Sequence, residues 1–246
     1  DLSTSAMLRA QSQGLSVFPV QLDITCIEQR AHVIEQITHE QGHIDVLINN
    51  AGIGIGGFLE EIEEDEFRKV LEVGIFGTWA LTKACLPALK KSRRGQIVMI
   101  SSLSGQMAIP GIGSYCTTKF ALEGLSETWR HELKTFGIDV IVVQPGAYQT
   151  DLIGEKRKVS RSVGSKDPQY QQMSQEMSHW YEKMVVQKAI DPSHLALRIV
   201  QLIKLEKTSF RYPIGPSTGV RKWLLQILPF AMIERYFQKI LRNRTQ

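Results

Sequence analysis

Three side chains between residues 97 and 125 are of types that together can transfer a proton. Tyr115 and Lys119 are four residues apart in a helix-like stretch, so they are expected to lie side by side on one helix face. A neighbouring ammonium favours the phenolate and is expected to lower the pKa of the tyrosine toward neutral pH. Ser102 follows an apolar strand-like run, and its hydroxyl is placed to hydrogen-bond the same reacting oxygen. The sequence therefore predicts a proton-transfer site built from Ser102, Tyr115 and Lys119.

The elements expected to position these residues alternate between strands and helices. Apolar runs predict strands at 16–22, 43–48, 96–100, 138–143 and 210–214, and helical spacing predicts helices at 27–40, 65–91, 114–136 and 191–203. The run at 138–143 is apolar except at Asp139, as expected of a strand covered on both faces. Strands that alternate with helices form right-handed β-α-β units around a parallel sheet. The predicted fold class is therefore α/β: one doubly wound, Rossmann-type domain over residues 1–246.

Composition and charge argue against several other classes of protein. At 246 residues the chain is long enough for one large α/β domain. The net charge of +4 is mild and no aromatic-and-basic motif is present, which argues against a nucleic-acid partner. Three widely spaced cysteines suit a reducing compartment and predict a cytoplasmic location. Residues 1–25 lack a signal-peptide pattern, no apolar run is long enough to span a bilayer, and His39 and His43 lack a third metal ligand.

Two further motifs accompany the serine, tyrosine and lysine, in a specific order along the chain. Asn49-Asn50-Ala51-Gly52 closes the predicted strand at 43–48, and Pro145-Gly146 with Thr150 follows the strand at 138–143. Together with Ser102 and the run Tyr115-Cys116-Thr117-Thr118-Lys119, these motifs resemble the short-chain dehydrogenase/reductase family. The resemblance is to the classical branch, in particular to hydroxysteroid and retinol dehydrogenases, and it covers nearly the whole chain.

The resemblance implies an oxidoreductase that transfers a hydride between NAD or NADP and a carbonyl or secondary alcohol. Tyr115 is then the general acid and base, Lys119 lowers its pKa and binds the ribose hydroxyls, and Ser102 orients the substrate oxygen. An apolar substrate of steroid, retinoid or lipid type is suggested by Ile109, Tyr148, Leu152 and the apolar C-terminal segment. The implied cofactor-binding residues are Asp23, Ile24, Asn50, Ala51, Gly52, Tyr115, Lys119, Pro145, Gly146 and Thr150.

The glycines between Gly52 and Gly57 satisfy G-x-G-x-x-G after a strand, yet they are not expected to bind the cofactor phosphates. Five carboxylates follow at once, between Glu60 and Asp65, and they would repel a pyrophosphate at a helix N-terminus. The family's own glycine motif is expected upstream of residue 1, so that roughly 35 to 40 residues of the first β-α-β portion are absent. The chain is then either a fragment or a protein that does not bind the cofactor in the usual way. The residues that select NAD or NADP belong to that portion.

Gly74 stands where the family usually has an asparagine that supports a water-linked proton relay to the lysine. A glycine carbonyl can still serve in such a relay, so a rewired or impaired relay is expected. A helix kink at Gly74 is an equally compatible explanation.

The remaining expectations concern the C-terminal third and the partners. Residues 151–190 are expected to form a substrate loop and lid, in which a mobile stretch at 154–175 leads into a helix through Trp180 and Met184. Residues 217–242 are expected to form an apolar helical segment interrupted by Pro229. Three roles compete for 218–241: a lid or core packing, an oligomer contact, and a peripheral membrane helix with basic flanks. The resemblance implies a homodimer or homotetramer that pairs through the helices at 65–91 and 114–136. The alternative function is that of a non-catalytic family member that binds or assembles with a partner.

Overall fold

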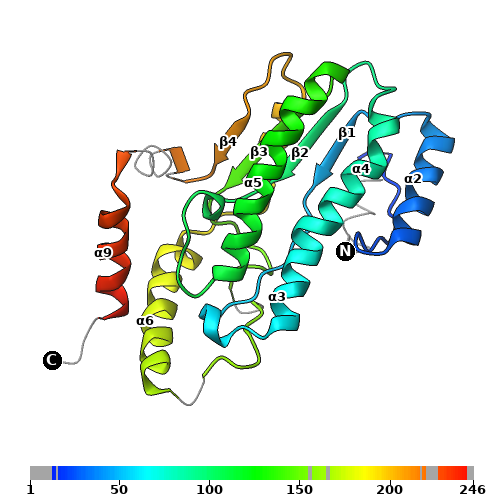
Figure 1. Ribbon diagram of the computed structural model, residues 1–246. Coiled ribbons are helices and arrows are strands. Elements are labelled where there is room, and N and C mark those ends of the chain that lie inside the picture. Colours follow the sequence, from blue (N-terminus) through cyan, green and yellow to red (C-terminus); the bar gives the residue numbers. More distant parts are fainter. Residues whose placement is uncertain are drawn as a thin grey trace.

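The computed structural model describes residues 13–14, 16–154, 157–164, 167–216, 218–219 and 227–242. Within these ranges four parallel strands form one sheet, in the spatial order β1-β2-β3-β4 (Figure 1). The strands are β1 (Val46–Asn49), β2 (Gln96–Ile100), β3 (Asp139–Pro145) and β4 (Arg211–Ile214). The central strands are in register from Gln96 opposite Asp139 to Ile100 opposite Val143. The predicted parallel sheet and four of its expected strands are confirmed.

Alternate side chains of the two central strands enter different hydrophobic cores, one on each face of the sheet. Ile97, Met99, Val140 and Val142 pack beneath α4 (Thr78–Leu89) and α5 (Gly113–Leu133). Their neighbours in β2 and β3 pack on the opposite face against α7 (Pro192–Ile203). Since side chains in a strand point alternately to the two faces, a run that is apolar throughout must be covered on both sides. The domain is therefore doubly wound, as predicted.

The other helices are α2 (Ile27–Gln41), α3 (Glu64–Leu71), α6 (Pro168–Met184) and α9 (Phe230–Leu241). The helix expected at 65–91 is divided, because a π-helical stretch, η2 (Glu72–Gly77), connects α3 with α4. At the margin of the molecule α9 packs on α6, where Trp180 Nε1 donates to the hydroxyl of Tyr236 at 2.7 Å (Figure 1). Much of 217–229, part of the predicted apolar segment, lies outside the described residues.

Residues 16–22 do not form the predicted strand. Phe18 is 74% exposed and Val20 is 47% exposed, and no ladder joins this segment to β1. The described sheet ends at β1, where Ile48 is itself 44% exposed. A strand requires a neighbouring strand for its backbone hydrogen bonds, so an apolar run that has none adopts an irregular extended path.

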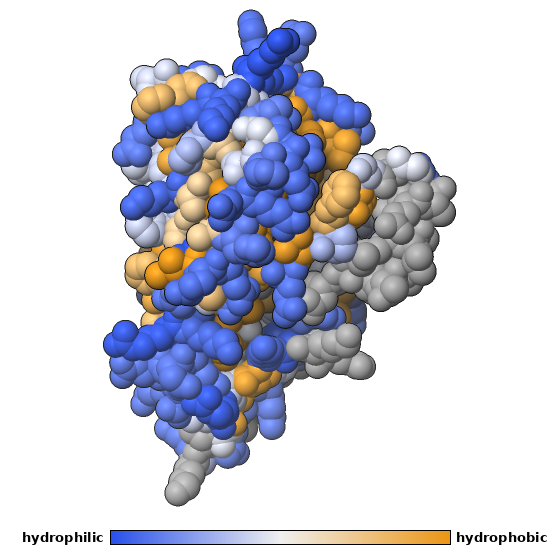
Figure 2. Space-filling model, turned by 90° about the vertical axis from the view of Figure 1, so that its right-hand side faces the viewer, coloured by the Kyte–Doolittle hydropathy of each residue, from blue (hydrophilic) through white to orange (hydrophobic). Residues whose placement is uncertain are grey.

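On the face seen in Figure 2, hydrophilic side chains predominate and apolar side chains are interspersed among them. Exposed aromatic rings also occur on the stretch predicted to pair with a second copy: Phe76, Trp79 and Phe120 are 56%, 41% and 46% exposed. Within the described ranges, no helix combines the length and the apolar character needed to cross a bilayer.

Candidate active site

The predicted serine, tyrosine and lysine come from the end of β2 and the start of α5. Ser102 follows β2 and caps the 3-10 turn η3 (Leu103–Gly105), where its Oγ accepts a hydrogen bond from Ser104 N at 3.1 Å. Tyr115 lies in the first turn of α5 and Lys119 in the second, and the Lys119 Nζ is 5.5 Å from the centre of the Tyr115 ring. The carboxyl end of a parallel strand is where ligands bind in open α/β sheets. The three side chains therefore lie in the place where such folds perform chemistry.

Lys119 is buried, with 8% of its surface exposed, and its Nζ donates to the carbonyl of Ile100 at 2.7 Å. Burial lowers the pKa of the Lys119 amine to about 8, while the negative charge of Glu123 opposes this change. The amine is thus fixed against the end of β2, and its charge responds to pH close to neutrality.

Tyr115 differs from the sequence-based expectation. Burial raises the pKa of its phenol to about 12, and the hydrogen bond with the Ser102 side chain opposes this only in part. The neighbouring Tyr181 of α6 raises the pKa further. The expected lowering by Lys119 is absent because burial makes the Lys119 amine lose its proton at a lower pH than the phenol does, so the amine is neutral when the phenol ionises. Here the phenol is an acid that holds its proton at neutral pH.

The turn after β1 approaches this pair closely. Asn50, Ala51 and Gly52 are exposed there, and a Cβ on Gly52 would lie 3.8 Å from the Lys119 Nζ. A Cβ on Gly54 would lie 3.4 Å from Tyr115 Cδ2 and 3.1 Å from Leu152 Cδ1. The predicted Asn50–Gly52 turn thus borders the lysine.

Asn49, the residue before this turn, is buried and holds β1 in place, since its Nδ2 donates to Thr82 Oγ1 of α4 at 2.8 Å. The glycines that follow lie beside Tyr115 and Lys119. Gly56 bonds to the 157–164 segment through its N–H and its carbonyl, and the Gly57 N–H donates to Gly111. These backbone hydrogen bonds fix the path of the turn.

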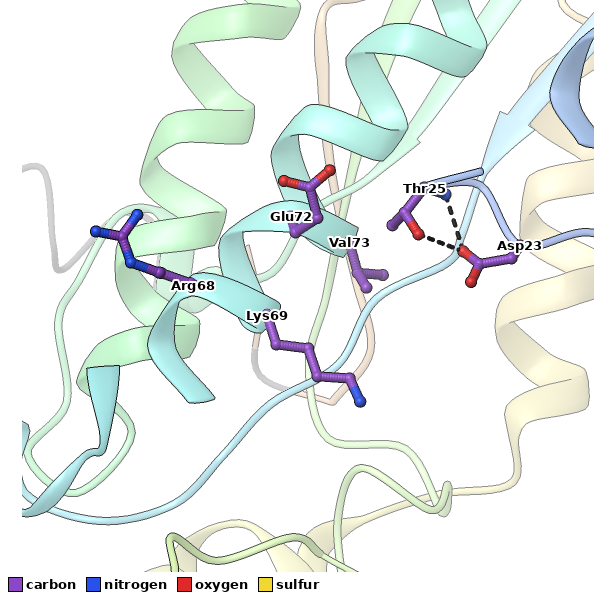
Figure 3. Close-up of a pocket in the computed structure, with 6 residues that line it drawn as sticks. All are labelled: Asp23, Thr25, Arg68, Lys69, Glu72 and Val73. Carbon is purple, nitrogen blue, oxygen red and sulfur yellow. Dashed lines mark hydrogen bonds between the residues drawn. The ribbon is translucent and has the colours of Figure 1, made fainter. Parts of the chain in front are cut away.

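A pocket of roughly 420 Å³ lies between the turn at 23–25 and the junction of α3 with η2 (Figure 3). Its polar lining residues are Asp23, Thr25, Arg68, Lys69 and Glu72. The Asp23 carboxylate accepts from the Thr25 N–H at 2.9 Å and from its hydroxyl at 2.7 Å. Ile24 packs against η2, where a Cβ on Gly77 would lie 2.9 Å from Ile24 Cγ1. Hydroxyl, carboxylate and ammonium groups around an open pocket fit the sugar and base of a nucleotide.

The pocket and the Tyr-Lys pair are on two sides of η2. Val73 lines the pocket, and the next residue, Gly74, faces α5, where a Cβ on it would lie only 2.2 Å from Thr118 Cγ2. Thr118 immediately precedes Lys119. The glycine is therefore required by the close approach of α5 to η2. The alternative of a helix irregularity at Gly74 also holds, since η2 is π-helical.

The predicted Pro145–Thr150 motif leaves the end of β3. The Gly146 N–H donates to the Ile214 carbonyl of β4 at 2.9 Å, and Thr150 is exposed. Tyr148, expected near the substrate, is 3% exposed and its hydroxyl is 3.0 Å from the Nδ1 of His194 in α7. That side chain anchors the motif to α7, because its hydroxyl already has a partner there.

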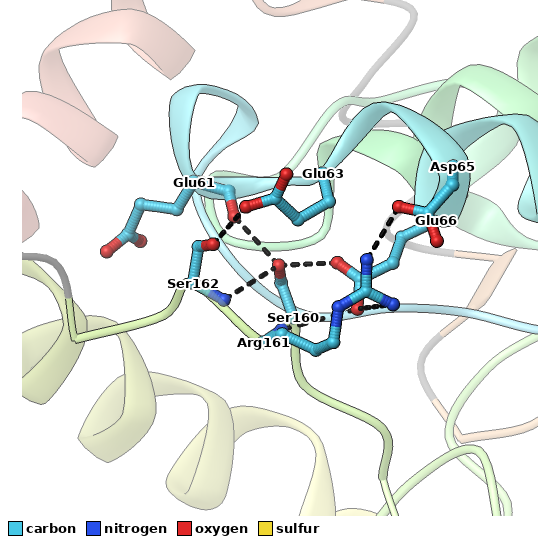
Figure 4. A network of polar contacts seen from close by, with 7 residues as sticks. All are labelled: Glu61, Glu63, Asp65, Glu66, Ser160, Arg161 and Ser162. Atoms are coloured by element: carbon cyan, nitrogen blue, oxygen red, sulfur yellow. Dashed lines mark hydrogen bonds and ion pairs between the residues drawn. The ribbon is translucent and has the colours of Figure 1, made fainter.

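Sequence reasoning missed a polar network that fastens the start of the 151–190 region to α3 (Figure 4). Ser160 Oγ donates to Glu66 Oε2 at 2.6 Å, and Arg161 pairs with Asp65 at 2.6 Å. Ser162 also bonds to Glu63. Two of the carboxylates that excluded the G-x-G-x-x-G run as a phosphate loop, Glu63 and Asp65, thus have partners almost a hundred residues away. No local signal identifies them, since only the fold brings the two segments together.

We expect Ser160→Ala to destabilise the fold by about 1–2 kcal/mol, because it removes a hydrogen bond from the buried Glu66 carboxylate. Ser162→Ala is the matched control. Because its partner Glu63 is exposed, this substitution should lower the stability of the fold much less. Urea unfolding of both variants measures the difference. Equal losses of stability would contradict a structural role for the Ser160 contact.

A second cluster that sequence reasoning missed lies beside the tyrosine. The guanidinium of Arg157 is 4.5 Å from the ring centre of Tyr181, and a Cβ on Gly56 would lie 3.6 Å from Arg157 Nε. The two residues come from separate segments of the 151–190 region. They bring that region over the turn that borders Tyr115.

Comparisons with known proteins agree with this geometry. The sequence profile of the short chain dehydrogenase family matches residues 3–160. The chain is 35% identical over 212 residues to a 3-ketodihydrosphingosine reductase of Bacteroides thetaiotaomicron, covering 82% of this chain and 76% of that protein. It is 30% identical over 225 residues to a probable short-chain type dehydrogenase/reductase of Helicobacter pylori, covering 92% of this chain and 82% of that protein.

Solved structures of short-chain dehydrogenases and related enzymes are also similar to this chain. A short-chain dehydrogenase of Streptomyces avermitilis superimposes with a TM-score of 0.74 at 31% identity, covering 96% of this chain and 86% of that one. An alcohol dehydrogenase of Thermococcus sibiricus, solved with 5-hydroxy-NADP, has a TM-score of 0.66 at 25% identity, covering 86% of this chain and 81% of that one. The ordered motifs, the doubly wound sheet and these relatives agree, and the chain belongs to the classical short-chain dehydrogenase/reductase family of oxidoreductases.

Proposed function

We propose that this protein transfers a hydride between NAD or NADP and the carbonyl or secondary alcohol of an apolar substrate. The observation that carries the proposal is the meeting of Ser102, from the end of β2, with Tyr115 and the buried Lys119 of α5. A phenol, a hydroxyl and an amine at the carboxyl edge of a parallel sheet supply the proton donor and the hydrogen bonds that carbonyl reduction needs.

The residues of this chain fit a bound nicotinamide dinucleotide. Asp23, Thr25 and Lys69 line a pocket of suitable chemistry, and the exposed turn at 50–52 leads from β1 to the lysine. When bound, the cofactor supplies or accepts the hydride. We assign Asp23, Ile24 and the Asn50–Gly52 turn to its adenosine part, and Pro145, Gly146 and Thr150 to its nicotinamide part.

In the reductive direction the Tyr115 phenol donates its proton to the substrate oxygen as the hydride arrives at the carbon. Its raised pKa suits this role, because the phenol is fully protonated at neutral pH. Ser102 holds the substrate oxygen by a second hydrogen bond. For oxidation the phenol must lose its proton first, and a charged Lys119 amine released from the Ile100 carbonyl would stabilise the phenolate.

An apolar substrate is supported by Leu152, whose Cδ1 lies against the Gly54 turn beside the tyrosine ring, and by half-buried Ile109. Reduction of a keto lipid is the activity named for the Bacteroides relative, at 35% identity. The exposed rings of Phe76, Trp79 and Phe120 support self-association through η2, α4 and α5, which we propose as the interface of a homodimer or homotetramer. The relatives are named as reductases and dehydrogenases, so they give no support to a non-catalytic role.

The decisive assay follows the absorbance of NADH and of NADPH in the presence of 3-ketodihydrosphingosine, a ketosteroid and retinal. We expect consumption of one reduced cofactor with at least one of these carbonyl compounds, and none without them. Calorimetric titration with both cofactors accompanies the assay. A folded protein that binds neither cofactor would overturn the proposal and favour the partner-binding alternative.

A further inference from the structure

Glu123 is a buried carboxylate that the proposed reaction does not use. It lies on α5, one helical turn after Lys119, with 6% of its surface exposed. Its Oε1 accepts a hydrogen bond from Gln144 Nε2 of β3 at 2.9 Å, and its Oε2 pairs with Arg211 Nε of β4 at 2.8 Å. A charge is costly to bury unless it is paired and hydrogen-bonded. Here the hydrogen bond from β3 and the ion pair with β4 offset the cost of burying this carboxylate on α5.

The position of this carboxylate connects it to the catalytic loop. A Cβ on Gly105, at the end of η3, would lie 3.0 Å from Glu123 Cγ, 3.0 Å from the Lys119 carbonyl and 2.9 Å from Ser101 Oγ. The loop that carries Ser102 therefore rests on the turn of α5 between Lys119 and Glu123. That contact admits only glycine at position 105, so the loop and the two charged residues form one packed unit.

Few titratable groups face the Lys119 amine within the described part of the chain. On α5 itself these are Tyr115 and Glu123. The Ile100 carbonyl of β2 and the Gly52 peptide, which do not titrate, also lie close to the amine. The positive charge of Arg211 faces Glu123 from β4, and the exposed Glu127 binds the other side of that arginine at 2.7 Å. Glu123 is thus the anion that acts on Lys119 against the effect of burial.

We propose that Glu123 is a positioning residue of the active site, whose buried carboxylate, held by Arg211 and Gln144, keeps the Lys119 amine charged and seats the Ser102 loop on α5. The charged amine can donate all of its hydrogen bonds and can stabilise a phenolate on Tyr115, whereas the neutral amine cannot. This inference rests on the proposed function for its catalytic consequence. The electrostatic effect itself can be measured without turnover.

The test compares Glu123→Gln with Glu127→Gln. Both variants remove one negative charge and one ion pair from the same arginine, but only Glu123 is buried beside Lys119. Competitive acetylation with acetic anhydride, with the Lys119 peptide quantified by mass spectrometry, measures the pH at which that amine loses its proton. Because an anion stabilises the ammonium, Glu123→Gln should lower this midpoint by about one pH unit, and Glu127→Gln should leave it unchanged.

The alkaline limb of the pH profile of kcat should move in the same direction. Activity that needs the ammonium is present below its pKa and is lost as the pH rises through it. A lower pKa therefore moves the limb to lower pH in Glu123→Gln and not in Glu127→Gln. A structural role alone would lower the amplitude of kcat without moving the limb.

Arg211→Gln provides a second, opposite test, which also covers the case that Glu123→Gln fails to fold. It removes the cation that offsets Glu123, so the Lys119 midpoint should rise. Unchanged midpoints in the folded variants would overturn the proposal. Shifted midpoints in a protein that reduces no carbonyl compound would instead refute the proposed function and leave the electrostatic role of Glu123 standing.

Discussion

Tyr115→Phe is expected to lower kcat for carbonyl reduction by about 10²–10⁴-fold, the usual contribution of a general acid. The substitution removes only the hydroxyl that donates the proton to the substrate oxygen. The aromatic ring, which lies against the Gly54 turn and beneath the Lys119 amine, keeps its contacts. Stopped assays with the preferred cofactor and substrate measure the loss, and thermal unfolding with calorimetric cofactor titration verifies that fold and binding are retained.

Tyr148→Phe is the matched control for this experiment. It removes the hydroxyl of a different tyrosine, which is buried and whose hydroxyl has His194 of α7 as its partner, in the anchor of the Pro145–Thr150 motif. We expect a modest loss of stability and a kcat close to that of the unchanged protein. If Tyr115→Phe retained more than about a tenth of the activity, the phenol would not be the proton donor and the mechanism would fail.

Most of the sheet could be predicted from the sequence because β2 and β3 can each be recognised from the residue types within one short stretch of chain. Each contains an unbroken apolar run, 97–100 in one and 140–143 in the other, and each is followed by residues that turn out of the sheet, Ser102 and Gly146 respectively. The placement of the candidate site residues was predictable for the same reason. Helical spacing alone places Tyr115 beside Lys119, and the strand end alone places Ser102.

The errors and omissions concern contacts between distant segments. Residues 16–22 have the composition of a strand but no neighbouring strand to pair with, and composition does not report on neighbours. Glu123 and Arg211 are 88 residues apart, so no local pattern could connect them. The pKa of Tyr115 was misjudged because spacing gives the distance between two side chains but not their burial, which raises the pKa of the phenol and lowers the pKa of the amine.

Gly74→Ala is the second substitution with a large expected effect, and it should destabilise the fold by about 1–3 kcal/mol, the usual cost of overpacking. The added Cβ would lie 2.2 Å from Thr118 Cγ2. Thr118 is 2% exposed and β-branched, and its Oγ1 donates to the Ser114 carbonyl at 3.1 Å, so it cannot rotate away without losing a buried hydrogen bond. The same clash would exclude the asparagine that the family usually has here.

A double-mutant cycle isolates this contact. Thr118→Ser removes the methyl group while keeping the hydroxyl, after which the nearest Thr118 atoms to a Cβ on Gly74 would be at 3.6 and 3.8 Å, ordinary van der Waals distances. Gly74→Ala should therefore cost little in the Thr118→Ser background, with a coupling of about 0.5–3 kcal/mol in urea unfolding. Gly124→Ala, on α5 with no atom within 4 Å of the added Cβ, should instead be neutral or stabilise by up to about 1 kcal/mol.

Additive losses in the cycle would show that Gly74 is needed for the π-helical backbone of η2 and not for its contact with α5. A double variant that loses less stability than the two single variants together would mean that the glycine and the threonine are one steric unit. A relay asparagine could then be introduced here only together with a smaller residue at position 118.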